Sequence, residues 1–312
     1  MRKSLALQTE MAEEFGACVF DVTLDCEDGA PVGGERDHAD MVVALVNEAV
    51  RGSRLARAGM KPRVAVRVHP VLHPAFAQDV QTIISGAGAA LCHLMVPKVE
   101  SVEDVALAVA ALDEAAGPAA AHLLPLHALI ESPAAVHRAF DIAAHPRVQS
   151  LSFGLMDFVS AHGGAIPADG MSGAGQFTHP LVLRAKLEIA SACHAHGKVP
   201  SHGVVTEFRD LAALEAAART ASRELGYTRM WSIHPGQIRT ILAAFAPSGH
   251  EIETATEIIL MAQLADWAPI DFGGQLQDRA SYRFFWQILE RAYRTGRPMP
   301  DAVRTYFESP LH

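Results

Sequence analysis

The sequence predicts an α/β protein: a TIM (β/α)8 barrel followed by a C-terminal helical arm. Apolar runs of strand length alternate with segments of helical periodicity, which is typical of a parallel α/β fold. The runs are almost continuously apolar, as strands covered on both faces must be. No glycine pattern of the dinucleotide-binding type follows the first run, which disfavours an open doubly wound sheet. The 312 residues suffice for one large barrel or for two ordinary domains.

Buried strands are expected at seven apolar runs, and an eighth strand is expected near the N-terminus, around Lys3–Gln8. The barrel then occupies residues 1–245, and residues 246–312 form a helical extension at a subunit interface. In chain order, the seven runs are Ala17–Leu24, Val64–Val68, Leu91–Val96, Leu123–Ile130, Val148–Phe153, Val199–Val205 and Met230–Ile233.

Two of the intervening helices have recognisable ends. Ser132 is an N-cap residue, and Pro133 at the first helical position opens a helix that continues to about Ala144. The segment Leu181–His196 is followed by Gly197, which suits the left-handed position after a helix.

The C-terminal arm is expected to hold two further helices. Ser248 and Glu251 have the spacing of a capping box ahead of an apolar run. A polar and aromatic helix is expected from about Asp278 to Arg294. Its aromatic residues need a surface to pack against, and a neighbouring subunit is one candidate.

Composition excludes several classes of protein. Lys and Arg number 26 against 35 Asp and Glu, so the formal net charge is −9. Without a basic run, the chain is a poor partner for nucleic acid or an anionic membrane. There is no apolar stretch long enough to span a membrane, and the N-terminus becomes polar too early for a signal peptide. The four dispersed cysteines are expected to be free thiols, and the protein is expected to be cytoplasmic.

The candidate site consists of the polar residues that follow the strands. In a parallel barrel, the carboxyl ends of the strands form the active-site face. A single charged residue there is usually a solvated loop residue, so the informative observation is the convergence of several. The residues expected to converge are Glu27, Asp28, Arg67, Glu131 and Asp157.

These side chains suit a hard divalent cation. Mg²⁺ and Mn²⁺ prefer oxygen ligands and commonly take one or two protein carboxylates. Glu131 and Asp157 follow adjacent strands and are the expected ligands, with Glu27 and Asp28 as outer partners through metal-bound water. Lys98, which follows the third run, leaves Schiff-base chemistry open as an alternative.

The sixteen histidines raise the possibility of a zinc site. His69 and His73 are four residues apart, but the prolines that follow both of them interrupt the helix that would align them. His194 and His196 lie at a helix end, where a cation interacts favourably with the helix dipole. Dispersed structural histidines are therefore the preferred interpretation.

Six short motifs, in order, carry a family resemblance. The chain resembles the citrate lyase β-subunit-like proteins of the HpcH/HpaI aldolase superfamily, which include malyl-CoA lyases. The matching segments are Leu24–Pro31 (LDCEDGAP), Val66–His69 (VRVH), Val96–Ser101 (VPKVES), Leu129–Pro133 (LIESP), Phe153–Asp157 (FGLMD) and Ile233–Ile238 (IHPGQI).

The resemblance implies a TIM barrel with a divalent metal on Glu131 and Asp157, and Arg67 on the substrate oxygens. It implies that a substrate carboxylate contacts the backbone of the segment Gly154, Leu155 and Met156. In the element Phe272–Asp278, it implies that Asp278 enters the site of a neighbouring subunit as an acid or base. A homo-oligomer, trimer or hexamer, is expected on this basis.

Several positions depart from the family pattern. His69 stands where asparagine is usual, and Ser201-His202 ends the sixth run where many members have an aspartate. Arg279-Ala280 replaces a residue–proline pair, and the loop Val159–His179 is long and glycine-rich, as in malyl-CoA lyases. The N-terminal stretch of the family pattern is also missing. These departures leave the exact substrate and the use of coenzyme A open.

The expected function is that of a Mg²⁺-dependent carbon–carbon lyase. It would cleave or form a 3-hydroxy acyl-CoA or a related hydroxy-dicarboxylate by retro-Claisen or aldol chemistry. Arg67, Asp278, Glu27 and Asp28 would be the catalytic residues. The alternatives are a malyl-CoA thioesterase, a malate-synthase-like activity at the same site, or a non-catalytic accessory subunit.

Overall fold

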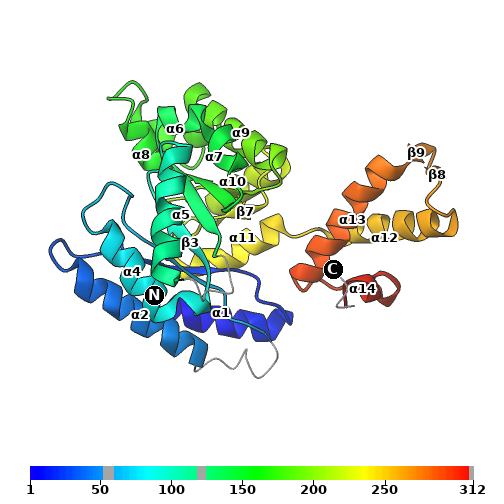
Figure 1. Cartoon of the computed structure of the whole chain (residues 1–312). Coiled ribbons are helices and arrows are strands. Elements are labelled where there is room, and N and C mark those ends of the chain that lie inside the picture. Colours follow the sequence, from blue (N-terminus) through cyan, green and yellow to red (C-terminus); the bar gives the residue numbers. More distant parts are fainter. Residues whose placement is uncertain (52–59, 118–123, 309–312) are drawn as a thin grey trace. The chain divides into compact units, whose positions relative to one another are not determined.

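The computed structural model describes residues 1–51, 60–117 and 124–308. These residues form two compact units (Figure 1). The sheet unit comprises Met1–Gln8 and Phe20–Phe245, and the helical unit comprises Thr9–Val19 and the chain from Ala246 onward. The helical unit therefore includes a short N-terminal segment in addition to the expected extension.

The sheet unit contains a curled sheet in which the described strands all run parallel, in the order of the chain. Two of the expected runs, Leu91–Val96 and Val148–Phe153, match their strands to the residue. Leu123, where another run was expected to begin, lies outside the described residues. The strands are β1 (Val22–Asp25), β2 (Val64–Arg67), β3 (Leu91–Val96), β4 (Leu126–Ile130), β5 (Val148–Phe153), β6 (Val199–His202) and β7 (Arg229–Met230).

The prediction of an eighth strand at Lys3–Gln8 is wrong, because that segment lies in helix α1 (Arg2–Phe15). Gln8, Met11 and Ala12 are buried at the spacing of one helix face. The segment also continues into strong helix formers, which a window of six residues does not show.

The parallel sheet is not closed in the described part of the chain, so the α/β class is confirmed and the complete eight-stranded barrel is not. Asp21, which precedes β1, forms an ion pair with Arg229 of β7. A pair of side chains therefore links the two edges of the curled sheet.

Helices cover the outer face of this sheet (Figure 1). Several of them contact one another, namely α2 (Glu35–Arg51) with α4 (Phe76–Ala87), α4 with α5 (Val102–Ala116), and α7 (Ala139–Ala144) with α9 (Pro180–Ala195). The helix expected from Pro133 to Ala144 is divided in two at Arg138. The remaining helices of the unit are α2 (Glu35–Arg51), α4 (Phe76–Ala87), α5 (Val102–Ala116), α6 (Pro133–His137), α7 (Ala139–Ala144), α8 (Leu155–Ser160), α9 (Pro180–Ala195), α10 (Leu211–Arg223) and α11 (Ile238–Phe245).

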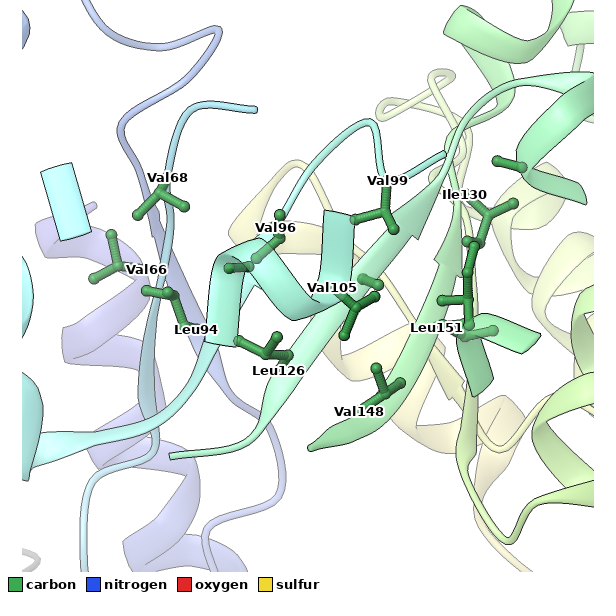
Figure 2. Packing of buried hydrophobic residues seen from close by; sticks show 14 of the residues in the cluster. Val66, Val68, Leu94, Val96, Val99, Val105, Leu126, Ile130, Val148 and Leu151 are labelled. Atoms are coloured by element: carbon green, nitrogen blue, oxygen red, sulfur yellow. The ribbon is translucent and has the colours of Figure 1, made fainter. Parts of the chain in front are cut away.

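The main core lies between the sheet and these helices (Figure 2). Each fully buried valine or leucine contributes about 1.5–3 kcal/mol to folding, and this burial fixes the strand ends that carry the site. Residues of this cluster include Val66, Leu94, Val96, Val105, Leu126, Ile130, Val148 and Leu151.

The helical unit has its own apolar core, which includes Ile259, Tyr282 and Leu289. Phe285 and Trp286 pack against this core, whereas Phe284 is exposed. Most of the aromatic helix therefore finds its packing surface within the same chain. The elements are α12 (Gly249–Leu264), β8 (Ile270–Phe272), β9 (Gln275–Gln277), α13 (Arg279–Arg294) and α14 (Asp301–Glu308).

The capping box predicted at Ser248 and Glu251 is confirmed at the start of α12. The hairpin between β8 and β9 was not expected. It turns on Gly273 and Gly274, whose φ angles of 62° and 80° are typical of such a two-residue turn. In the part of the chain that the structure describes, no helix is long and apolar enough to cross a membrane.

Candidate functional site

Polar side chains gather where the first strands of the sheet end. Asp25 and Arg67 are the last residues of β1 and β2, and Glu131 directly follows β4. Lys98 follows β3 after one proline. Because the strands are parallel, their carboxyl ends all lie on the same side of the sheet, and these residues lie there together.

Arg67 binds three acidic side chains from the end of β1 and the loop after it. Its Nε and Nη2 donate to Oδ1 and Oδ2 of Asp25, both at 2.7 Å, in a bidentate pair. Its Nη1 lies 2.6 Å from Oε2 of Glu27 and 3.3 Å from Oδ2 of Asp28. The guanidinium also lies over the ring of Trp231, with its central carbon 5.5 Å from the ring centroid.

This network changes the acidity of its members. Burial alone would raise the pKa of Asp25, but the hydrogen bonds and charge of Arg67 dominate and lower it. Burial raises the pKa of Glu27 although Lys98 and Arg67 act against it. Burial opposes the charge of Arg67, yet the surrounding carboxylates raise the guanidinium pKa further. Arg67 therefore carries a fixed positive charge.

Lys98 contacts two glutamates in different ways. Its backbone N–H donates to Oε2 of Glu131 at 2.7 Å, and its Nζ donates to Oε1 of Glu27 at 2.8 Å. The hydrogen bond to Glu27 is the main cause of the raised pKa of Lys98. This residue is a cation at neutral pH and binds a carboxylate, which disfavours the Schiff-base alternative because that needs a neutral amine.

Glu131 is the most deeply buried carboxylate of the candidate site, with 7% of its surface exposed. Burial raises the pKa of Glu131 to about 7, and the negative charges of Asp157 and Glu27 raise it as well. Gly154 lies against it: a Cβ atom at position 154 would be 2.3 Å from Oε1 of Glu131. The glycine is therefore needed for this carboxylate to occupy its position.

Asp157 lies in the first turn of α8 and is exposed. Its charge acts on both Glu131 and Lys98, so the structure brings these three groups into one electrostatic environment. In the segment predicted to contact a substrate carboxylate, Gly154 precedes α8, Leu155 is buried and Met156 is exposed.

Asp278 lies in the helical unit, apart from the other predicted site residues in sequence. Its side chain caps α13 by accepting hydrogen bonds from the N–H groups of Ala280 and Ser281, at 2.8 and 3.4 Å. Asp278 thus has a structural task within its own chain.

Asp25, Trp231 and the pairing of His69 with Asp79 were not predicted from the sequence. Nδ1 of His69 lies 2.6 Å from Oδ2 of Asp79, which is 1% exposed, and the His69 ring stacks on that of His73 at 4.3 Å. Asp25 could have been found, since it directly follows an apolar run. Asp79 lies on a helix, so nothing in the sequence pattern points to it.

The described chain contains one further group of potential metal ligands, formed by Asp21, Cys92 and His93. The ligand atoms of these three residues lie within 4.8 Å of one another. Asp21 is already paired with two arginines, Arg63 and Arg229, so its charge is compensated without a metal. The four cysteines, all in described segments, are thiols and form no disulfide.

The carboxyl ends of the strands, where these acidic side chains and the arginine lie, are the usual place of the active site in an α/β-barrel enzyme. The chain belongs to the HpcH/HpaI aldolase/citrate lyase family, which it matches over residues 4–235. The prediction of a carbon–carbon lyase is thereby confirmed at the level of the family.

Individual relatives agree with this assignment. The chain is 31% identical over 299 residues to an L-malyl-CoA/beta-methylmalyl-CoA lyase from Cereibacter sphaeroides, covering 90% of each chain. A citrate lyase structure from Burkholderia xenovorans LB400 is 50% identical, with a TM-score of 0.81 and coverage of 96% of this chain and 90% of that one. The protein CitE from Mycobacterium tuberculosis, in complex with magnesium, acetoacetate and coenzyme A, is 23% identical and shares the fold. Its TM-score is 0.63, with coverage of 92% and 95%.

Proposed function

We propose that this protein is a Mg²⁺-dependent lyase that cleaves or forms a carbon–carbon bond in a 3-hydroxy acyl-CoA or a related hydroxy-dicarboxylate. The observation that carries the proposal is the buried carboxylate of Glu131, placed within the field of Asp157 and Glu27. The ionised form of a buried carboxyl group is unfavourable when no positive charge is near it, and a bound cation compensates the negative charge.

The residues present fit a divalent cation held by Glu131 and Asp157. Both offer hard oxygen ligands, and Mn²⁺ suits the same donors. Gly154 leaves the space that the Glu131 carboxylate needs. The CitE structure from M. tuberculosis contains magnesium together with acetoacetate and coenzyme A, which supports both the cation and an acyl-CoA substrate here.

Arg67 is proposed to bind substrate oxygens. Most of its donors are held by the chain's own carboxylates, but Asp28 is its weakest partner, at 3.3 Å and with 67% of the side chain exposed. A substrate carboxylate that displaces Asp28 would receive a charge-assisted hydrogen bond from Nη1. Asp25 would meanwhile keep the guanidinium in place.

In the cleavage direction, a base removes the proton of the substrate hydroxyl, which becomes a carbonyl as the carbon–carbon bond breaks. The electron pair passes to the carbon next to the thioester or carboxylate, and this carbon then takes up a proton. When bound, the cation polarises the substrate oxygens and offsets negative charge. Glu27 and Asp28 support the proton transfer, and Asp278 of a neighbouring subunit is the proposed acid in a trimer or hexamer.

The proposal is tested by offering the purified protein, with Mg²⁺, a panel of hydroxyacyl-CoA thioesters and free hydroxy acids. We expect a shorter acyl-CoA and a 2-oxo acid as products, identified by mass spectrometry. Glu131→Gln should reduce turnover by at least about 100-fold, whereas Glu257→Gln, on the exposed face of α12, should leave it unchanged.

Other products would point to the other candidate functions. Free coenzyme A with an intact hydroxy acid would indicate a thioesterase. No turnover without a second protein would indicate an accessory subunit. Turnover that is unaffected by removing Mg²⁺ would contradict the proposal.

A further inference from the structure

We propose that Lys98 is a positioning residue that gives the two buried glutamates different tasks. Its backbone N–H holds Glu131 for the cation, and its ammonium group holds Glu27 on Arg67 and away from the cation. This inference rests on the proposed function because it assumes that Glu131 binds a cation.

The hydrogen bonds divide the two carboxylates clearly. Glu27 has both oxygens on cationic groups: Oε1 is 2.8 Å from Nζ of Lys98, and Oε2 is 2.6 Å from Nη1 of Arg67. Within the described chain, the hydrogen bond to Glu131 comes from a neutral donor, the backbone N–H of Lys98, on Oε2 at 2.7 Å. Its charge thus remains available for a metal ion, whereas that of Glu27 is already balanced.

The backbone of Lys98 supports a role for its side chain. Its φ angle is 52°, and among the described non-glycine residues only Asp266 and Trp267 also have positive φ. This left-handed conformation is costly for a lysine, while glycine adopts it freely. Glycine would supply the same N–H to Glu131, so the strain is explained by what the lysine side chain does at Glu27.

A direct consequence concerns metal affinity. Without the ammonium group, Glu27 loses one of its two cationic partners, and its negative charge acts more strongly on the neighbouring Glu131 site. Lys98→Met should therefore bind Mg²⁺ roughly 3- to 10-fold more tightly than the wild type. The reason is that the negative charge of Glu27, no longer balanced by the ammonium group, attracts the cation more strongly. Turnover should fall, since Glu27 is no longer held in its catalytic position.

The experiment measures Mg²⁺ binding to the full chain by isothermal titration calorimetry, without substrate, alongside turnover. The variants are Lys98→Met, Lys98→Gly and Lys98→Arg. Lys98→Gly should resemble Lys98→Met in Mg²⁺ affinity and turnover. Because glycine relieves the backbone strain at this position, this variant can be measured even if Lys98→Met does not fold. Lys98→Arg keeps the charge and should restore the wild-type affinity.

Two controls separate positioning from stability. Asp266→Gly removes a positive φ of nearly the same value, 50°, at an exposed position, and should change neither Mg²⁺ affinity nor turnover. In a Glu27→Gln background, Lys98→Met should raise the affinity less than it does in the wild type. The carboxylate that the lysine restrains is then absent, and only the direct action of the lysine charge on Glu131 is lost.

The outcomes distinguish this inference from the proposed function. If wild-type protein binds no Mg²⁺, the proposed function fails. If the wild type binds Mg²⁺ but Lys98→Met and Lys98→Gly show unchanged or weaker affinity, the role of Lys98 is refuted and the proposed function stands.

Discussion

Gly154 lies so close to Glu131 that a larger residue would displace the carboxylate. Its backbone angles, φ −88° and ψ 88°, are open to other residues, so the requirement for glycine is purely steric. The nearest atoms to an added Cβ would be Oε1 and Cγ of Glu131, at 2.3 and 2.6 Å. The proposed metal ligand is therefore kept in place by the absence of a side chain next to it.

Gly154→Ala should reduce turnover by about 100-fold or more, because a shift of about 1 Å in a catalytic group has that effect. Mg²⁺ affinity, measured by calorimetry, should fall with it. Gly249→Ala, at the start of α12 with nothing within 4 Å of the added Cβ, is the matched control and should remain fully active. Full activity in Gly154→Ala would show that Glu131 does not need its present position.

The residues of the site were partly predictable. Arg67 lies near the end of one apolar run and Glu131 directly follows another, and their type and place in the sequence suffice to propose them. Asp25 was not predicted, although it directly follows an apolar run and forms the bidentate pair with Arg67. The role of Lys98 depends on a backbone angle, which residue types do not reveal.

At the scale of elements, β3 and β4 each place a histidine on the sheet face opposite the apolar cluster. His93 and His127 are 1% and 3% exposed, and their rings stack at 5.5 Å. Burial, with a smaller contribution from Arg63, lowers the pKa of His93 to about 4. Burial also lowers the pKa of His127, which is hydrogen-bonded to Ser150 and Ser152.

These histidines should make the protein sensitive to acid. A histidine whose pKa is lower in the folded state contributes stability above its unfolded pKa of about 6.5, and loses it as the pH falls towards the folded value. For His93 this contribution is of the order of 3 kcal/mol. The thermal midpoint should therefore drop between pH 7 and pH 5.

His93→Leu should flatten that pH dependence, because the variant lacks this titrating imidazole. The substitution also removes the buried Nε2 that has no hydrogen-bond partner in the structure. Thermal melts at several pH values between 7 and 5 provide the measurement. The exposed His250 offers a control, since His250→Leu should leave the pH dependence unchanged. Equal slopes for His93→Leu and the wild type would refute the assignment.

Elements with a strong local signal were predictable. Strands β3 and β5 are uniformly apolar and match to the residue. The division of a helix at Arg138 and the hairpin after α12 depend on local geometry that the apolar pattern does not encode. The first residues of the N-terminal helix resemble a strand by themselves, and only the helix formers that follow them indicate a helix.

At the scale of the whole molecule, the sheet unit carries Arg67, Glu131 and Asp157, while Asp278 belongs to the helical unit. The grouping of residues 9–19 with the helical unit could not be read from the sequence. It depends on contacts between distant segments, such as the close approach of Gly296 to the backbone of Phe15.

Asp278→Asn separates the structural and the proposed catalytic task of this residue. Asparagine is an equally good N-cap, so the thermal midpoint should hardly change, whereas Asp278→Ala should cost about 1 kcal/mol. If Asp278 supplies a proton, both variants should lose turnover. An active Asp278→Asn variant would limit the residue to capping α13.

Mixing subunits tests whether Asp278 acts in a neighbouring chain. Glu131→Gln and Asp278→Asn, each inactive alone, should regain partial turnover when the two variants are refolded together. Some sites then combine an intact Glu131 from one subunit with an intact Asp278 from its neighbour. Light scattering should show a trimer or hexamer. A monomer, or mixed subunits that stay inactive, would contradict donation between chains.

The ion pair between Asp21 and Arg229 has a consequence for the order of folding. Its partners are roughly 200 residues apart in the chain, so it forms only after most of the sheet has assembled. Until then, the outer edges of β1 and β7 are not held near each other by this pair, and exposed strand edges pair readily with other chains. Incompletely folded copies are therefore the form of this protein most exposed to aggregation.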